Sequence, residues 1–138
     1  MTPALLVAAT VFAMSDRLEV PLVANGVMLN QVERAVIQQT NQQRQQHGLR
    51  PLRVNGWLMK SARRHCAWMT NARRLQHTTA AVGENIAMGQ RTSRQAVRDW
   101  MHSPGHRANM LNGSYTKAGA TAYHTPEGTI YWCLQFSR

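Results

Sequence analysis

Residues 100–111 read WMHSPGHRANML, a dense combination of histidine, proline, glycine and asparagine. The Pro-Gly pair within this stretch breaks a helix, because proline has no amide hydrogen and glycine loses the most backbone freedom on folding. We therefore expect one helix to end just before Ser103 and a separate helical turn to begin at His106.

Working outward from this stretch, apolar residues recur at helical spacing in three places nearer the N-terminus. Asn30 and Glu33 have the spacing of a capping box at the start of the first helix, and Thr92 with Gln95 at the start of the third. The predicted helices run from about residue 31 to 47, from after Asn55 to near residue 73, and from residue 92 to the break at residue 103.

The C-terminal part of the chain has the pattern of strands. Residues 117–124 and 129–136 are joined by Thr-Pro-Glu-Gly, which is typical of a hairpin. Residues 75–90 show no helical period and carry two glycines, so we expect an extended loop with at most one short strand near residues 84–88. These elements predict an α+β fold with a small sheet covered at least partly on both faces by helices.

Composition limits the classes of function. The chain has 138 residues, 43% of them hydrophobic and 16% charged, which predicts one ordinary folded domain, and no apolar run is long enough to span a bilayer. The formal net charge is +10, from 16 basic and 6 acidic residues, so we expect electrostatic attraction to acidic polymers. No RNA-binding signature or zinc-finger spacing accompanies the arginines, so no specific nucleic-acid role is expected.

The N-terminal residues suggest export. Residues 1–14 read MTPALLVAATVFAM, which is a signal peptide lacking basic residues or an apolar segment that packs on the domain as a strand or helix. We expect residues 15–27 to be a linker and residues 28–138 to form the domain. Cys66 and Cys133 are too far apart for a C-x-x-C motif, and they form either a disulfide or two buried free thiols.

Two motifs together carry a resemblance to a known family. They are G-E-N-I-A at residues 83–87 and W-x-x-S-P-G-H-R-x-N-x-L at residues 100–111, accompanied by YWCLQF at 131–136 and GLRPL at 48–52. On these motifs the sequence resembles the CAP superfamily (SCP/TAPS; cysteine-rich secretory, antigen 5 and pathogenesis-related proteins) in its short bacterial form. The resemblance implies an α-β-α sandwich, with a small central antiparallel sheet flanked by helices and a shallow cleft lined by histidines and acidic residues.

The resemblance also implies the residues of the cleft. His77 and His106 match the two cleft histidines, and Glu84 matches the glutamate of the G-E-N motif. Ser103 stands where eukaryotic members carry a second cleft glutamate, so the expected cleft is His77, Glu84, Ser103 and His106, with one carboxylate fewer. His102 precedes His106 by four residues, but the intervening Pro-Gly pair spoils a helical metal-ligand geometry, and we interpret His102 as a rim residue.

The chemistry of these groups leaves two alternatives open. His77 and His106 are candidate ligands for a divalent metal such as zinc, with Glu84 as a third ligand or a base, and all three are candidate catalytic residues. Without a metal, pairing with Glu84 would orient a histidine for proton transfer. The four tryptophans are interpreted first as core or interface residues, and only then as ligand platforms.

We expect a secreted or envelope-associated binding or scaffold module rather than an enzyme. The family resemblance leaves its extracellular ligand open among a lipid, a glycan, a cell-wall polymer and a protein. The alternative is a metal-assisted hydrolase that acts on peptide or cell-wall substrate.

Overall fold

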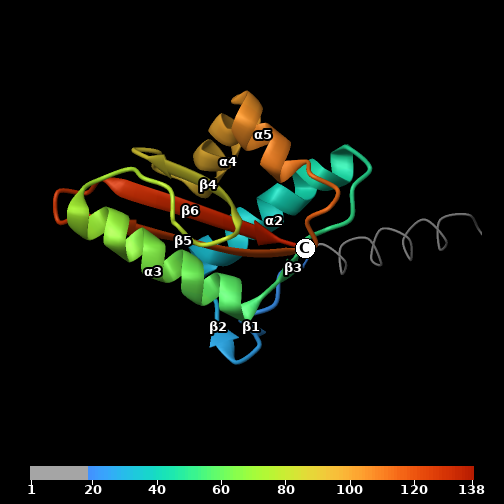
Figure 1. Cartoon of the computed structure of the whole chain (residues 1–138), viewed down its shortest axis with the longest axis horizontal. Helices are drawn as coiled ribbons and strands as arrows, with labels where there is room; N and C mark the ends of the chain where they lie inside the picture. The colour runs from blue at the N-terminus through green and yellow to red at the C-terminus, as the bar shows by residue number, and fades with distance from the viewer. Residues whose placement is uncertain (1–18) are drawn as a thin grey trace, which may run out of the picture.

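The computed structural model describes residues 19–138, and the predicted helices and hairpin are confirmed to within about two residues at each end (Figure 1). The elements, in chain order, are β1 (Val23–Ala24), β2 (Val27–Met28), α2 (Gln31–Gln46), β3 (Arg53–Val54), α3 (Gly56–Ala72), β4 (Gly83–Met88), α4 (Ser93–Met101), α5 (Pro104–Met110), β5 (Lys117–His124) and β6 (Ile130–Ser137). N-terminal caps are part of the reason. The capping box at Asn30 is complete, with Asn30 accepting from the Glu33 amide at 2.8 Å and Glu33 accepting from the Asn30 amide at 3.0 Å. Thr92 accepts from the Gln95 amide at 3.1 Å, but the Gln95 side chain accepts from the Arg91 amide instead of closing the second box.

The main sheet has four strands in the order β3-β5-β6-β4. Strand β6 lies in the middle and pairs antiparallel with both β5 and β4. The expected central antiparallel sheet is confirmed, and the short strand β3 adds a two-residue parallel pair with β5 at its edge.

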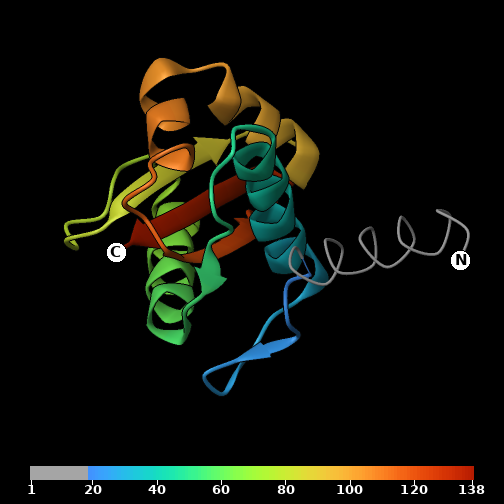
Figure 2. The ribbon, with the colours of Figure 1, turned by 90° about the vertical axis from the view of Figure 1, so that its right-hand side faces the viewer.

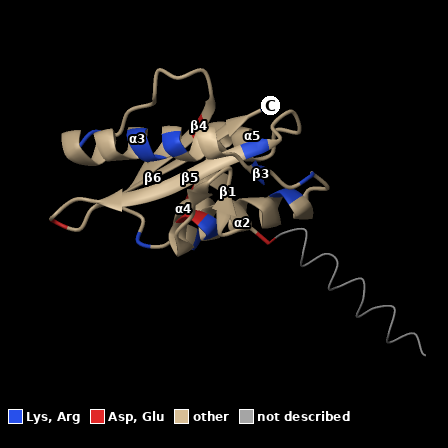
Figure 3. Cartoon of the chain, turned by 90° about the horizontal axis from the view of Figure 1, so that it is seen from below, with Lys and Arg blue, Asp and Glu red and all other residues tan. Residues whose placement is uncertain are grey.

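Helices cover both faces of this sheet, which confirms the α-β-α sandwich. Helix α3 lies on one face, and α2 and α4 lie on the other (Figures 2 and 3). Successive side chains of β6 point to opposite faces of the sheet, which explains the two core clusters. Trp132, Leu134 and Phe136 belong to the cluster on the side of α2 and α4, and Tyr131 and Cys133 belong to the cluster under α3.

Helix α3 packs very closely on β5 at one position. A Cβ atom at Gly119 would lie 2.3 Å from the backbone carbon of Leu58, so only glycine fits there. The helix backbone therefore rests directly on the sheet at this point.

Two buried charges connect separate elements. Glu33 of α2 is 1% exposed and accepts two hydrogen bonds from Arg63 of α3, at 2.9 and 2.7 Å, and one from Thr121 of β5 at 2.9 Å. Arg44, also 1% exposed, has no carboxylate partner among the described residues and instead donates to four backbone carbonyls. One of these carbonyls belongs to Met110, at the end of α5, so Arg44 fixes α5 against α2.

The first described residues carry a small hairpin. Strand β1 forms a two-residue antiparallel pair with β2, and Val20 and Val27 are buried against the main core. This segment therefore packs on the domain as a small hairpin. The apolar segment 1–14 lies outside the described residues.

Both cysteines are free and buried. The Cys66 thiol donates to the Tyr131 carbonyl at 3.3 Å, and Cys133 lies in the same core cluster under α3. Of the two alternatives left open by the sequence, the structure has the buried thiols.

Candidate functional site

His77 and Glu84 are in direct contact at the edge of the sheet. Glu84 belongs to β4, and His77 lies in the loop that leads from α3 to this strand. Nδ1 of His77 is 2.8 Å from Oε1 of Glu84. An ionised carboxylate can only accept, so Nδ1 of His77 carries the hydrogen of this bond. The side chain of His77 is 61% exposed while that of Glu84 is 3% exposed. The buried carboxylate therefore holds the His77 ring while Nε2 of that ring faces solvent.

The Glu84 carboxylate is occupied on both oxygens. Oε1 also accepts from the backbone amide of Thr78 at 3.0 Å, and Oε2 accepts from Nε2 of Gln135 at 2.9 Å. The Cys133 thiol contacts Oε2 at 3.6 Å. Since these donors surround the buried carboxylate, its main role is to hold His77 and the loop before β4 in place.

The neighbouring residue on β4 faces the other side of the sheet. Successive side chains of a strand point to opposite faces, so Asn85 points away from α3 and toward α5. Its Nδ2 donates to the backbone carbonyl of His106 at 3.0 Å, and its Oδ1 accepts from Nδ2 of Asn109 at 3.0 Å. Asn109 also donates to the Glu84 carbonyl at 3.2 Å, so α5 is bonded along the edge strand.

His106 is half-buried on α5 and is electrostatically linked to His77. Burial, followed by the nearby charge of His77, lowers the pKa of His106 below its usual value. The imidazole of His106 is therefore neutral at neutral pH. His77 contacts Glu84, and the backbone carbonyl of His106 accepts from the neighbouring Asn85, so both histidines lie along the edge strand β4.

Ser103 and His102 lie at the junction between α4 and α5. Ser103 is the N-cap of α5 without a side-chain cap hydrogen bond, and none of its hydrogen bonds within residues 19–138 reaches His77, Glu84 or the His106 side chain. His102 is exposed, and its Nδ1 lies 2.7 Å from the Arg98 carbonyl. The direct contacts therefore unite His77 with Glu84, and they bring His106 beside them through Asn85.

The residues do not fit a tightly held zinc ion. Within residues 19–138, no three His, Cys, Asp or Glu side chains are grouped so that they could hold a metal. Glu84 is already occupied by donors, so His77 and His106 could offer at most two nitrogens, whereas zinc sites in proteins use three or four protein ligands. These groups therefore give no basis for a metal-dependent step.

Sequence reasoning missed two residues that shape the site. Gln135 stands directly opposite Glu84 in the β4–β6 register, and Asn109 bridges α5 to β4. Asn109 belongs to the quoted motif, so its position gave a signal. Gln135 lies in the quoted YWCLQF stretch, but its role depends on which strand pairs with β4, and the motif does not show this.

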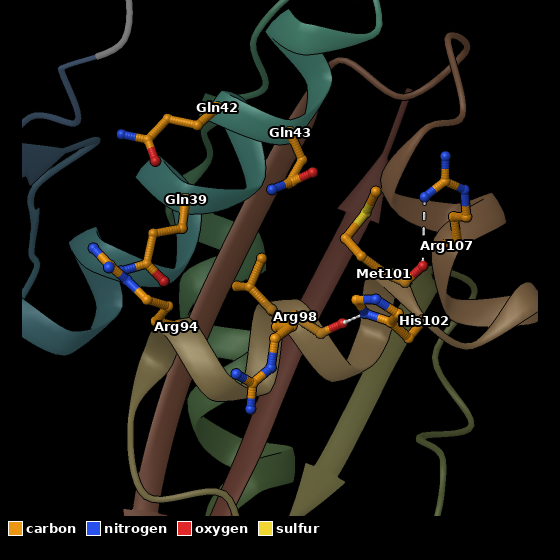
Figure 4. Close-up of a pocket in the computed structure, with 9 residues that line it drawn as sticks. Gln39, Gln42, Gln43, Arg94, Arg98, Met101, His102 and Arg107 are labelled. Carbon is orange, nitrogen blue, oxygen red and sulfur yellow. Dashed lines mark hydrogen bonds between the residues drawn. The ribbon is translucent and has the colours of Figure 1, made fainter.

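Shallow hollows surround the domain. One of about 410 Å³ lies between α2 and α4 and is lined by polar and basic side chains (Figure 4). Glutamines come from α2, Arg94 and Arg98 from α4, and Arg107 from α5. On the opposite face, two adjoining hollows follow α3 and reach His77. The candidate site therefore continues into the α3 face rather than into the α2–α4 hollow.

Comparison with known proteins agrees with this architecture. The chain is 35% identical over 121 residues to the uncharacterized protein YkwD of Bacillus subtilis, covering 75% of this chain and 46% of that protein. The chain thus spans about half the length of this relative.

Solved structures with the same fold include two bacterial surface or extracellular proteins. An outer surface protein from Borrelia burgdorferi superimposes with a TM-score of 0.67 at 19% identity, covering 73% of this chain and 87% of that one. An extracellular protein containing an SCP domain from Bacillus anthracis superimposes with a TM-score of 0.66 at 23% identity, covering 86% of this chain and 44% of that one.

The family assignment follows from the sequence match itself. Residues 37–136 match the family described as CAP: Cysteine-rich secretory protein family, a range that includes α3, the edge strand β4 and both histidines of the site. The chain belongs to the CAP superfamily.

Proposed function

We propose that this CAP domain is an extracellular binding module, secreted or associated with the cell envelope, whose ligand docks over the edge strand β4. The observation that carries the proposal is the Glu84 carboxylate, which is buried and accepts from His77, Thr78 and Gln135. A carboxylate held in this way fixes a histidine in one orientation and presents its Nε2 to a ligand. The same arrangement would also orient His77 for proton transfer through Nε2, so the hydrolase alternative is tested directly below.

The extracellular setting is supported by the names of similar proteins. The Bacillus anthracis structure is described as an extracellular protein and the Borrelia burgdorferi structure as an outer surface protein. Within residues 19–138 no helix is long and apolar enough to cross a bilayer. Basic positions on α3 (Figure 3), of which Lys60 and Arg64 are exposed, together with a net charge of +10, favour contact with acidic envelope polymer.

Cosedimentation with purified cell-wall and membrane fractions of a Gram-positive bacterium tests the proposal. We expect the wild-type domain to sediment with one fraction and the His77→Ala, His106→Ala double variant to sediment several-fold less. His124→Ala, which removes an exposed histidine of the β5–β6 hairpin, is the matched control and should behave as wild type.

The hydrolase alternative is tested in the same cosedimentation samples. Release of soluble cell-wall fragments or peptides on addition of zinc, lost in the double variant, would overturn the binding-module proposal. Equal sedimentation of the wild type and the double variant would also overturn it.

A further inference from the structure

The outer face of α3 carries two exposed tryptophans. Trp57 is 61% exposed and Trp68 is 42% exposed, in contrast to the buried Trp100 and Trp132. Eleven residues of helix separate them, which corresponds to about 16 Å along the axis and a rotation of about 20°. The two indoles therefore lie on the same side of the helix, at opposite ends of one groove.

Polar groups lie between and opposite the two indoles. A hollow of about 390 Å³ runs between α3 and the loop at residues 78–80, lined by Trp57, Ser61, Arg64, His65, Trp68, Thr78, Thr79 and Ala80. Arg64 is exposed, and it is in none of the carboxylate ion pairs found within residues 19–138. The groove therefore combines flat apolar surfaces, hydroxyl groups and one available cation.

The groove is held in shape before any ligand binds. The ring of His65 stacks on Trp68, with centroids 5.7 Å apart and an angle of 14° between the planes. Nε2 of His65 is 2.6 Å from the carbonyl of Gln76, and the Thr78 amide donates to Glu84. Trp68 and the facing loop are thus fixed, which lowers the entropy lost on binding.

The same groove leads to the candidate site. A second hollow, of about 240 Å³, is lined by His77 and Gln76 and shares His65, Trp68, Thr78 and Thr79 with the first. A chain molecule lying along α3 would therefore reach the exposed Nε2 of His77.

We propose that the groove between Trp57 and Trp68 binds an acidic oligosaccharide, a chain of pyranose rings that carries carboxylates. Sugar rings have apolar C–H faces that stack on an indole, and hydroxyl edges that bond to serine and threonine. Arg64 supplies the partner for a carboxylate between the stacked rings. This inference rests on the proposed function and names the ligand class of that binding module.

The alternation of residue types distinguishes a glycan from a membrane surface. A lipid-binding face presents contiguous apolar side chains with cations at its rim. Here the cation lies between the indoles, and hydroxyl groups face it from the loop. The groove is also longer than a single ring, so it fits an oligosaccharide better than a monosaccharide.

Binding of soluble probes by calorimetry tests the inference. An oligogalacturonate should bind the wild-type domain, and Trp57→Ala and Trp68→Ala should each weaken binding by roughly tenfold. Trp57→Phe should restore most of the affinity, and Arg64→Gln should weaken binding several-fold. Arg94→Gln removes the same charge from the α2–α4 hollow and should leave the affinity within about twofold.

Three results would overturn the inference. Poly-glutamate binding as tightly as oligogalacturonate would mean that charge alone acts. A neutral chito-oligosaccharide binding equally well would remove the role of Arg64. Tryptophan-dependent binding to anionic phospholipid vesicles, without glycan binding, would assign the face to a membrane surface.

The cosedimentation assay separates this inference from the proposed function. If Trp57→Ala sediments as wild type while the His77→Ala, His106→Ala variant does not, the groove inference fails and the binding module stands. If neither variant changes sedimentation, both fail.

Discussion

Replacing Glu84 by glutamine tests whether the carboxylate is the structural anchor of the site. Glutamine can keep its oxygen toward His77 and Thr78, but its amide group then faces Nε2 of Gln135, which is also a donor. Oε1 of Gln135 is buried and has no hydrogen-bond partner within residues 19–138. A half-turn of the Gln135 amide would bring this oxygen onto the new amide, and the count of unpaired buried atoms would not change.

The loss of stability in Glu84→Gln follows from the change in hydrogen bonds to residue 84. Hydrogen bonds to a charged acceptor contribute about 1.5–3 kcal/mol and neutral ones about 0.5–1.5 kcal/mol, and part of the loss is offset because a buried charge is removed. We expect Glu84→Gln to lower the free energy of unfolding by about 1–2 kcal/mol. Glu84→Ala leaves the Thr78 and Gln135 donors without an acceptor and creates a cavity, so it should cost about 3–5 kcal/mol.

Urea unfolding at neutral pH gives both values by linear extrapolation. Nitrogen NMR of the His77 ring adds a local readout, because the Nδ1–H form should persist in Glu84→Gln and lose its preference in Glu84→Ala. Equal costs for the two variants would show that the Gln135 amide does not turn. A cost below about 1 kcal/mol for Glu84→Ala would refute the role of the carboxylate as an anchor.

Three further predictions concern protonation and buried groups. The pKa of His106 lies below its unfolded value of 6.5, so the contribution of neutral His106 to stability is complete above that pH and is lost as the pH falls through the lowered pKa. We therefore expect His106→Asn to reduce the fall in the urea unfolding midpoint between about pH 7 and pH 5. An unchanged fall would contradict the assignment. Burial raises the pKa of Cys66 to about 11 and raises that of Cys133 as well. Ellman's reagent should therefore detect no reactive thiol in the native protein and two thiols in denaturant. Detection of no thiol in denaturant would indicate a disulfide. Arg44→Met leaves four carbonyls without their donor and should cost about 2–4 kcal/mol in urea unfolding, with Arg44→Lys intermediate; a neutral Arg44→Met would mean that water replaces the guanidinium.

The sequence was most informative where local chemistry determines structure. Helix starts at Asn30 and Thr92 could be predicted because capping residues act within one turn. The two-residue strands β1 and β3 could not, since they are too short to show a period and form only against partners outside their own segment. The same limit explains the hairpin at residues 23–28, most of which the sequence pattern assigns to a linker.

The residues of the candidate site could be predicted from local motifs, whereas their contacts could not. His77, Glu84 and His106 were identified through the family motifs, but their contacts depend on the pairing of β4 with β6, which no local pattern encodes. The positions of Trp57 and Trp68 carried a usable signal, because they fall outside the apolar stripe of α3 at Leu58, Ala62 and Cys66. Interpreting tryptophan first as a core residue concealed that signal.

The central position of β6 has a consequence for biosynthesis. Every long strand pairing of the main sheet involves residues 130–137, so until this segment has left the ribosome β4 has no strand partner and β5 has only the two-residue strand β3. A truncation before residue 130 removes the central strand of the sheet, so it should yield a substrate for cellular proteases rather than a smaller domain.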